Sequence, residues 1–570
     1  MATFTGNNSI DALFHSSWAG FTQTPISLTY SFLKATPADA TARDALGFAP
    51  MTAQQQAATK VAMAAWSAVA NITYTEVASG GMLGIATNDQ GTESGGYASY
   101  PNGTRPIYLY TNNTGDYNFK FADGDYGRDV LLHELGHMLG LKHPGDYADD
   151  HLAHHEGPFL PAWADNKDYT VMSYNNGVGR ALHGNYGISP MLYDIQIVQL
   201  LYGANMNYHA GADRYSFVKD SAPQCIWDAG GTDTLDFSSC TGSVVINMNA
   251  GTFSSTAPGY DNVSIAFNVT MERAVAGSGG STIYGNDAGN VITGGIRDDR
   301  VYLGKGSDTV TGGGGSDIVV FEKNLADYTI SRSSLALTVK GEGTDLLNNI
   351  PMLYFKDIWV RPSDYIGISG GGNGDDVFRA GTGSELFTGG AGNDTVAYSR
   401  ERANFTVSSR DGHSFGVYDK GGSGGNDLVS GVERLKFSDG SGVALDIDGA
   451  AGQTYRLYQA AFNRTPDQGG FSFWLDKMDD GLGLVGMAQF FLDSAENVAT
   501  YGTLTDAQFV GQVYTNVLHR QPDAGGLDFY LKGLAAGLTR ATVLADFSES
   551  TENQAAVIGS ITNGINYTVF

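Results

Sequence analysis

The sequence has little cysteine, a deficit of positive charge and no long apolar run. Among its 570 residues only Cys225 and Cys240 are cysteines, which excludes a scaffold held by many disulfides and leaves either one bridge or two buried thiols. Lysine and arginine number 33 against 60 aspartates and glutamates, and the resulting net charge of −27 argues against a nucleic acid or an anionic membrane as partner. No stretch approaches the roughly 18 apolar residues of a transmembrane helix, so we expect no membrane span.

The first residues, MATFTGNNSIDALFHSSW, contain neither the basic nor the apolar stretch of a secretory signal peptide. If the protein is exported, we therefore expect either another route or a leader that has been lost. The chain is too long for a single core, and its hydrophobic fraction of 42% is sufficient for several packed domains.

The first 205 residues mix strand and helix patterns. Residues 26–32, 72–77 and 106–111 are expected to be strands, and residues 52–71 a helix that begins with a capping box of Thr52 and Gln55. Residues 190–205 have helical periodicity, with Pro190 in the first turn. This alternation predicts an α/β or α+β domain.

The segment HELGHMLGLKH, residues 133–143, places three histidines and a glutamate in an apolar run. On a helix His133 and His137 project from the same face one turn apart, and both imidazoles can reach one zinc ion. Gly140 lets the chain leave the helix, so that His143 can supply a third ligand and leave one coordination position open for chemistry. Glu134 can then act as general base towards a metal-bound water.

This extended pattern is far more specific than its five-residue core, which occurs by chance. The alternative, three histidines without a metal, leaves unexplained why basic rings stand on an apolar helix. A second group, His151 and His155 in DDHLAHHEGP, lacks the glutamate and is interpreted as a loop. Two G-x-S-x-G matches follow from glycine abundance and are discarded.

Glycine, at 77 residues, is concentrated from residue 276 onwards. Five nonamers end at Val320 and three more cover residues 371–397, and they match the G-G-x-G-x-D-x-U-x repeat of calcium-binding parallel β-rolls. A flexible glycine-rich linker is the alternative, but an apolar residue stands at every eighth place. The candidate calcium ligands at the sixth place are Asp299, Asp308, Asp317, Asp376, Glu385 and Asp394. Ser281 and Asn290 are neutral there and Arg297 replaces a turn glycine, so we expect weak binding in the first coils.

Two larger repeats surround the nonamers. Residues 312–331 match residues 389–408, and residues 344–357 match 426–439, which indicates that a β-roll module with a β-rich tail is duplicated. Residues 458–475 align without a gap with residues 514–531, and SAEN at 494–497 aligns with STEN at 550–553. The end of the chain is therefore predicted to be a duplicated helical module, in which the shared Arg-x-Pro-Asp-x-Gly-Gly turn is interpreted as structural rather than as a ligand site.

Together with YTVMSYNN at 169–176, the zinc motif resembles the metzincin endopeptidases, and among them the serralysins, over about residues 20–320. The resemblance implies that Met172 forms the turn beneath the metal and that Tyr174 is a displaceable zinc ligand that can stabilise the oxyanion. It also implies one catalytic zinc, several structural calcium ions, and type I secretion of an unfolded chain that folds in millimolar calcium. The final repeats resemble a helical module of unassigned function in bacterial secreted and surface proteins.

The expected fold class is therefore multidomain, with an α/β metzincin catalytic domain, a parallel β-roll and β-rich region, and an all-α C-terminal module. The predicted boundaries are 1–205, a β-rich connector over 206–275, roll modules over 276–370 and 371–447, and helical repeats over 448–570.

The expected function is an extracellular zinc endopeptidase that acts on protein or peptide substrates. Two alternatives remain: a non-catalytic calcium-binding surface or adhesion protein, and a protease dedicated to surface-layer proteins, with the helical module as docking element.

Overall fold

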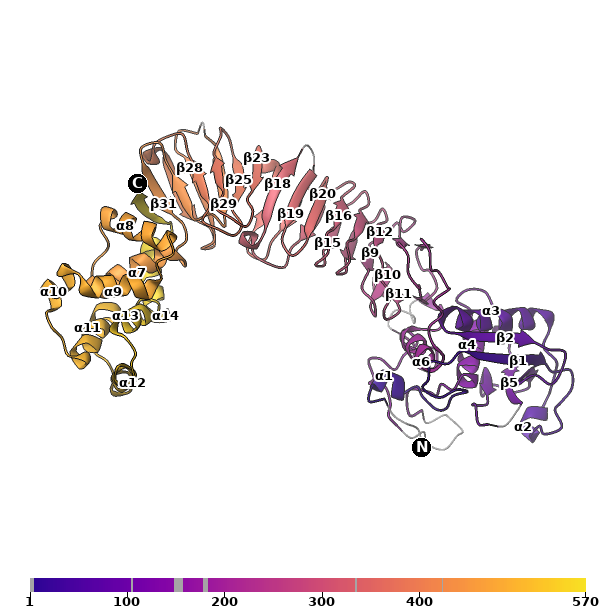
Figure 1. The fold of residues 1–570 in the computed structure, drawn as a ribbon. Coiled ribbons are helices and arrows are strands. Elements are labelled where there is room, and N and C mark those ends of the chain that lie inside the picture. The colour runs from indigo at the N-terminus through magenta and orange to yellow at the C-terminus, as the bar shows by residue number, and fades with distance from the viewer. Residues whose placement is uncertain are drawn as a thin grey trace. The chain divides into compact units, whose positions relative to one another are not determined.

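The computed structural model describes residues 5–103, 106–147, 157–177, 183–333, 336–422 and 424–569. These residues form two compact units, one over Met1–Val320 with Asn348–Ile350 and one over Phe321–Leu347 with Pro351–Phe570. The ribbon in Figure 1 confirms a multidomain chain in which a long β-rich region precedes a helical module.

A five-stranded sheet organises the N-terminal part of the first unit. Its strands are β1 (Ile26–Phe32), β2 (Ile72–Glu76), β3 (Leu83–Asn88), β4 (Gly96–Ala98) and β5 (Ile107–Asn112), in the order β2-β1-β3-β5-β4. Four strands run parallel, and β4 is antiparallel to β5 at one edge. The three strands predicted from the sequence are confirmed.

Helices pack against this sheet and against one another. They are α1 (Asn8–Asp11), α2 (Ala42–Ala45), α3 (Ala53–Val69), α4 (Tyr126–Met138) and α6 (Leu192–Tyr202), with the 3-10 turn η1 (Asp116–Phe119). The predicted capping box of Thr52 and Gln55 is confirmed at the start of α3. The fully buried Trp66 of α3 donates its indole N–H to the Leu132 carbonyl of α4 at 3.2 Å, so the two helices are fixed against each other.

The placement of Pro190 inside the first turn of a helix is wrong. Met191 is the N-cap of α6, so Pro190 lies outside the helix. The start is fixed by Asp194, whose carboxylate accepts the Met191 N–H at 2.8 Å.

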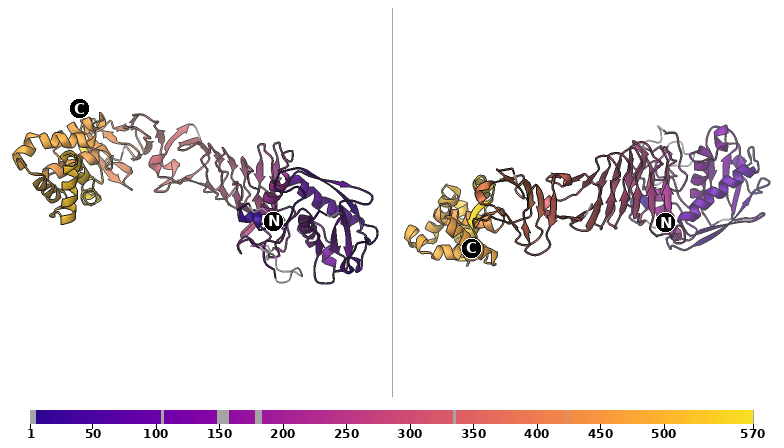
Figure 2. Two further views of the ribbon diagram at one scale, coloured as in Figure 1. Left: turned by 60° about the horizontal axis from the view of Figure 1, so that its bottom comes forward. Right: turned by 90° about the horizontal axis from the view of Figure 1, so that it is seen from above.

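Short strands, most of them parallel to their neighbours, form two stacked sheets in the rest of the first unit. The strands are β6 (Arg214–Ser216), β7 (Gln224–Ile226), β8 (Thr234–Asp236), β9 (Val244–Asn247), β10 (Phe253–Ala257), β11 (Tyr260–Ile265), β12 (Arg273–Val275), β13 (Ser281–Tyr284), β14 (Val291–Thr293), β15 (Arg300–Tyr302), β16 (Thr309–Thr311) and β17 (Ile318–Val320). One sheet contains β6-β8-β12-β14-β16 and the other contains β9-β13-β15-β17, extended by β10, β11 and β7. The stacking of short strands is visible from two sides in Figure 2.

The nonamers form this roll with two repeats per coil. Ile283 pairs with Val301, and Val301 pairs with Val319, so residues 18 apart lie side by side. All three side chains are buried, as expected for the eighth place of the repeat. The stacking begins upstream of the glycine-rich segment, because β6 and β8 already pair in parallel with β8 and β12.

The second unit repeats this plan. Its strands are β18 (Thr329–Ser333), β19 (Ala336–Lys340), β20 (Thr344–Asn348), β21 (Met352–Tyr354), β22 (Trp359–Val360), β23 (Gly367–Gly370), β24 (Val377–Arg379), β25 (Glu385–Thr388), β26 (Thr395–Ala397), β27 (Phe405–Ser409), β28 (Ser414–Asp419), β29 (Asn426–Ser430), β30 (Arg434–Lys436), β31 (Ser441–Ala444) and β32 (Ile565–Thr568). The turns η2 (Leu325–Asp327), η3 (Pro362–Asp364) and η4 (Arg402–Asn404) connect them. The predicted duplication is confirmed, because β17, η2, β20 and β21 recur in the same order as β26, η4, β29 and β30.

The helical module consists of α7 (Ala450–Phe462), α8 (Gln468–Asp479), α9 (Leu484–Asp493), α10 (Ala495–Tyr501), α11 (Asp506–Leu518), α12 (Ala524–Ala535), α13 (Arg540–Ser548) and α14 (Thr551–Ile561). Asp467 and Asp523, one in each copy of the predicted turn, cap α8 and α12 by accepting the Gly470 and Gly526 N–H groups at 2.8 Å. The predicted helical repeat and the structural role of its turn are thereby confirmed.

The module is inserted between two strands of one sheet. After α14 the chain returns as β32, which pairs antiparallel with β31, and Ala444 faces Ile565. The buried Arg434 of β30 also reaches Asp446 and Asp479, each at 2.5 Å, and so connects the sheet to the end of α8.

Both cysteines are free thiols and both are buried. Of the described helices, none is long and apolar enough to cross a membrane.

Candidate metal centre

Helix α4 presents two of the three candidate ligands. His133 and His137 lie one turn apart and are 7% and 6% exposed, while Leu131 and Leu135 on the same helix are buried in the core. The helix is therefore held in place by apolar contacts while its imidazoles face one another.

The third histidine is delivered by a turn that only glycine permits. The Gly140 N–H donates to the His137 carbonyl at 2.9 Å and the Leu141 N–H donates to the Gly136 carbonyl at 3.0 Å, which is a Schellman motif. Gly140 has a φ of 100°, and a Cβ at this position would lie 2.0 Å from the Ser16 carbonyl oxygen. Gly140 therefore ends α4 as predicted and directs the chain back towards His143.

The three imidazoles converge through their Nε2 atoms. Nε2 of His143 lies 3.1 Å from Nε2 of His133 and 3.1 Å from Nε2 of His137. Two nitrogens bound to one tetrahedral zinc at 2.0–2.1 Å would stand roughly 3.3 Å apart. The spacing of the trio therefore fits a single zinc ion.

The hydrogen bonds on the far side of the rings support this fit. Nδ1 of His133 donates to the Val171 carbonyl and Nδ1 of His137 donates to the Leu141 carbonyl, both at 2.8 Å, which leaves a lone pair on each Nε2. A neutral His143 can offer at most one Nε2–H, so at least one of the two close contacts brings lone pairs together. Burial, with the neighbouring imidazoles, also holds the pKa of His133 well below its ordinary value. A cation between the neutral rings would bind the lone pairs of all three Nε2 atoms.

Glu134 lies beside the trio and is 5% exposed. Its Oε2 is buried and makes no hydrogen bond with the described residues, and its Cγ would lie 3.0 Å from a Cβ on Gly96 of strand β4. Burial raises the pKa of its carboxyl to about 8. A carboxyl group with a free oxygen at the edge of the site is suited to exchange protons with a reacting water.

The turn after Asn166 passes beneath and beside the histidines. Met172 is fully buried, and its Sδ lies 2.5 Å from the position that a Cβ on Gly136 would occupy. Tyr174 is 50% exposed, and its ring centroid lies 4.5 Å from that of His143 and 5.8 Å from that of His133. Both residues therefore lie next to the predicted metal site.

Two aspartates that support this turn were missed by the sequence analysis. Asp194 of α6 accepts the Thr170 Oγ1–H at 2.6 Å and the Val171 N–H at 2.8 Å. Burial raises its pKa to about 6. Asp194 thus fixes the residue whose carbonyl orients His133.

The second missed aspartate, Asp165, fixes the residues on either side of Tyr174. It accepts hydrogen bonds from the hydroxyl of Ser173 at 2.7 Å and from the side-chain amide of Asn175 at 3.1 Å, and it also binds the Tyr147 hydroxyl. No local pattern marks Asp165 or Asp194, because their partners lie on other segments of the chain.

The predicted calcium ligands lie in rows along the two rolls. Asp299, Asp308, Asp317 and Asp394 are buried, whereas Asp376 and Glu385 are half-exposed. Most accept a backbone N–H from the coil before them, as Asp299 does from Ser281 at 2.6 Å and Asp317 does from Asp299 at 2.9 Å.

Some carboxylate oxygens of these aspartates have no partner among the described residues and fit a divalent cation. Oδ2 of Asp317 and Oδ2 of Asp394 are buried and make no hydrogen bond with the described residues. Burial raises the pKa of Asp317 to about 6 and also raises that of Asp299 and Asp394. Buried carboxylates with unsatisfied oxygens are the ligands that calcium prefers.

A further acidic cluster lies before the nonamers and was not predicted. One carboxylate oxygen from each of Asp213, Asp228 and Asp233 lies within 4.8 Å of the other two. Oδ2 of Asp233 is buried without a hydrogen-bond partner in the described structure, and burial, with Asp228 and Glu272 nearby, raises its pKa to about 6. These oxygens could also hold a divalent cation. The segments DRYSF and WDAGGTD that carry them lack the nonamer pattern.

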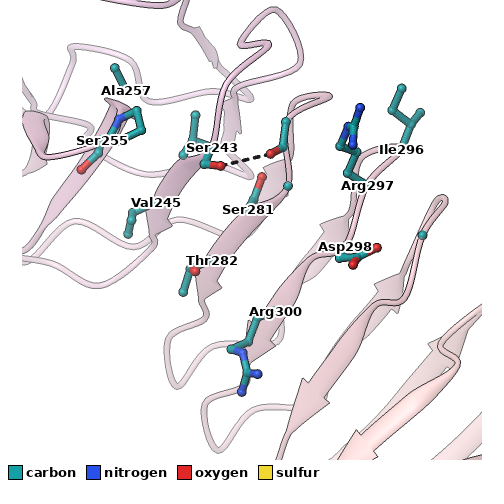
Figure 3. A pocket seen from close by; sticks show the side chains of 15 residues that line it. Ser243, Val245, Ser255, Ala257, Ser281, Thr282, Ile296, Arg297, Asp298 and Arg300 are labelled. Atoms are coloured by element: carbon teal, nitrogen blue, oxygen red, sulfur yellow. Dashed lines mark hydrogen bonds between the residues drawn. The ribbon is translucent and has the colours of Figure 1, made fainter.

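A cavity of about 730 Å³ lies beside the first nonamers (Figure 3). Arg297, which replaces a turn glycine, and Arg300 both line it, but their guanidinium groups point in different directions. They therefore do not form one anion site. His151 and His155 lie outside the described residues.

Two protein families match the chain. The family described as "Peptidase M10 serralysin C terminal" matches residues 193–417, and "Domain of unknown function (DUF4214)" matches residues 454–498 and 488–557. The first family covers the first roll region and part of the second, and the second family covers most of the helical module.

Curated proteins match a little less than half of the chain. Metallopeptidase AprA of Pseudomonas marginalis is 36% identical over 300 residues, which cover 47% of this chain and 61% of that protein. Serralysin of Proteus mirabilis is 38% identical, over 40% of this chain and 53% of that protein. Serralysin A of Dickeya chrysanthemi is 35% identical, over 44% and 57%. The chain thus spans less than two thirds of the length of these relatives.

Proposed function

Because these matches support a serralysin-type metalloprotease, we propose that the chain is a secreted, zinc-dependent endopeptidase that cleaves protein substrates. Residues 1–205 would be its metzincin catalytic domain, and the rolls and helical module would follow as calcium-dependent and accessory parts. The observation that carries the proposal is the convergence of three Nε2 atoms next to a buried carboxyl group with an unsatisfied oxygen.

His133, His137 and His143 would hold the zinc through neutral imidazoles. When bound, zinc supplies a Lewis acid that polarises a carbonyl group and makes a water molecule acidic enough to react near neutral pH. The carbonyl groups of Val171 and Leu141 keep two of the rings in the correct tautomer.

Glu134 would act first as general base and then as general acid. Its unsatisfied oxygen accepts a proton from the attacking water, and the same carboxyl group then donates it to the leaving amine. Tyr174, next to His143, would donate its phenolic O–H to the oxyanion as it forms.

Strand β4 would position the substrate. It pairs with β5 on one side only and ends the sheet, so an extended peptide can add to its other edge through main-chain hydrogen bonds. Gly96 on this strand lies next to Glu134, which places the added peptide near the reacting groups.

Calcium would stabilise both rolls. Asp299, Asp317 and Asp394 would bind it through buried oxygens, and Asp213, Asp228 and Asp233 would form another site. Extracellular calcium sites typically have dissociation constants of about 10⁻⁴–10⁻³ M, so the rolls would fold outside the cell.

The Glu134→Gln variant tests the catalytic proposal. We expect unchanged zinc content by metal analysis, while casein hydrolysis falls by about 10²-fold or more because the proton acceptor is lost. Glu76→Gln, at a surface ion pair with Lys60, is the matched control and should retain activity. Full activity in Glu134→Gln would refute the mechanism, and an inactive wild-type protein with bound zinc would favour the non-catalytic surface protein instead.

A further inference from the structure

The two copies in the helical module allow position-by-position comparison. The helices α7–α10 begin at Ala450, Gln468, Leu484 and Ala495, and α11–α14 begin 56 residues later, at Asp506, Ala524, Arg540 and Thr551. The pair Arg464–Glu496 recurs as Arg520–Glu552. Residues 56 apart are therefore structural equivalents, and a difference between them marks a place where the copies have diverged.

One helix contact in this module is closed by an arginine. Helix α7 packs directly on α13, and between them the guanidinium of Arg456 is 3% exposed. It donates from Nε and Nη2 to the two carboxylate oxygens of Glu549 at 2.8 and 2.6 Å, and from Nη1 to the Ile447 carbonyl at 2.8 Å. The space between the helices is thus filled by a charged side chain of the protein itself.

The equivalent pair of helices, α11 and α9, is not bridged by an ion pair in the part of the chain that the structure describes. The equivalent of Arg456 is Gln512 and that of Glu549 is Asp493, and both line a cavity of about 360 Å³. Gln512 donates its amide N–H to Oδ1 of the buried Asn516 at 2.7 Å, and Asp493 accepts the Gln489 amide at 3.0 Å. Among the described residues no cation pairs with Asp493. This copy therefore has the carboxylate of the pair but no guanidinium.

The rest of the cavity is mainly apolar, which suits the aliphatic part of a long side chain. Its walls combine aliphatic and aromatic side chains, namely Leu492, Val498, Tyr501, Leu504, Phe509, Val513 and Leu544. Arg540 also borders it, but its guanidinium donates to Asp506 Oδ1 at 2.6 Å and to the Leu504 carbonyl at 2.8 Å, so its charge is already paired.

We propose that this cavity binds an arginine side chain presented by a partner protein. The guanidinium would meet Asp493 and the amide oxygen of Gln512, as Arg456 meets Glu549 in the other copy, while the methylene stem would lie along the apolar wall. Residues 450–569 contain 12 aspartates and glutamates against 6 lysines and arginines, a balance that attracts a basic partner. The proposal gives the helical module a function as a recognition domain and is independent of the catalytic proposal.

Binding of acetyl-Ala-Arg-Ala-amide to the full chain, loaded with zinc and calcium, tests the proposal by calorimetry. The matched probe replaces arginine by citrulline, which has the same shape without the charge. We expect the arginine peptide to bind about tenfold or more tightly than the citrulline peptide, because only the former forms charge-assisted hydrogen bonds. Equal binding of the two peptides, or no binding of either, would overturn the proposal.

Two variants locate the site. Asp493→Asn should lower the affinity for the arginine peptide about tenfold. Asp528→Asn, which removes an exposed carboxylate of α12, should leave that affinity unchanged. The double variant Gln512→Arg with Asp493→Glu rebuilds the Arg456–Glu549 pair, so it should fold and no longer bind the peptide. Unchanged affinity in Asp493→Asn or in the folded double variant would refute the assignment.

Discussion

At the scale of single residues, the metal centre depends on groups that do not touch the reacting atoms. His133 is oriented by the Val171 carbonyl, and Val171 is in turn held by Asp194, which is completely buried. Residues of this kind set the ligand geometry that metal affinity depends on.

The variant Asp194→Ala should remove that support. Three donors, the Thr170 hydroxyl and the N–H groups of Val171 and Met191, lose their acceptor, and buried unpaired donors cost about 1–3 kcal/mol each. We expect the free energy of unfolding to fall by about 3 kcal/mol and zinc affinity to fall by about 10-fold or more. Urea unfolding and competition with a zinc chelator measure the two effects, and Asp116→Ala on the exposed turn η1 is the control.

The sequence could predict His133, Glu134, His137, Gly140 and His143 because their spacing follows the turn of one helix and its end. It could not predict Asp165 or Asp194, because each acts on residues 8 to 24 positions away through a loop whose path no local pattern determines. The acidic cluster around Asp233 was missed for the same reason.

At the scale of secondary structure elements, the end of α4 determines where the third ligand lies. Gly140→Ala would place a Cβ 2.0 Å from the Ser16 carbonyl oxygen, at a φ of 100° that disfavours any other residue. We expect a loss of about 3 kcal/mol or more in unfolding free energy, and reduced zinc content because His143 is displaced.

The control for this variant separates steric overlap from backbone strain. Gly20 has a φ of 73° with open space around it, so Gly20→Ala should cost only about 1 kcal/mol and leave zinc content unchanged. Equal losses of unfolding free energy in the two variants would show that overlap with Ser16 does not contribute to the effect of Gly140→Ala.

The rolls should respond to pH when calcium is removed. Burial raises the pKa of Asp317 from 3.8 to about 6, so between these values the folded roll binds more protons than the unfolded chain. With calcium removed by a chelator, the free energy of unfolding should therefore fall as pH rises through this window. It should be higher at about pH 5 than at about pH 7.5. Urea unfolding checks this, and Asp317→Asn should reduce the slope whereas Asp287→Asn should not.

The period of the nonamers was sufficient to predict which side chains enter the roll, because each coil repeats the same geometry. Strands β6, β8 and β9 could not be assigned to the roll in this way, because their sequences lack the glycine and aspartate signature. Helix α6 begins later than its periodicity suggested, since a tertiary contact of Asp194 determines its first residue.

At the scale of the whole molecule, duplication made the order of elements in the second unit predictable. The antiparallel pairing of β31 with β32 was not predictable, because 120 residues separate Ala444 from its partner Ile565. The contact of Arg434 with Asp479, 45 positions further along the chain, was also missed.

The variant Arg434→Ala should loosen the helical module from the second roll. Arg434 is 4% exposed and pairs with Asp446 and Asp479, and breaking a buried ion pair from one side typically costs about 3–5 kcal/mol. We expect faster hydrogen exchange in α8 and β30, with Arg379→Ala on β24 as the control. Unchanged exchange would mean that apolar contacts alone hold the module.

The return of the chain through β32 also has a practical consequence for dissecting this protein. Cutting the chain before α7 would remove β32 and turn β31 into the edge strand of its sheet, paired with β30 alone. Its exposed main-chain donors and acceptors would favour aggregation, so a poorly behaved truncation would say little about what the helices do. A cleaner excision would join Ala444 to Ile565 through an Asn-Gly turn and keep both strands as a hairpin.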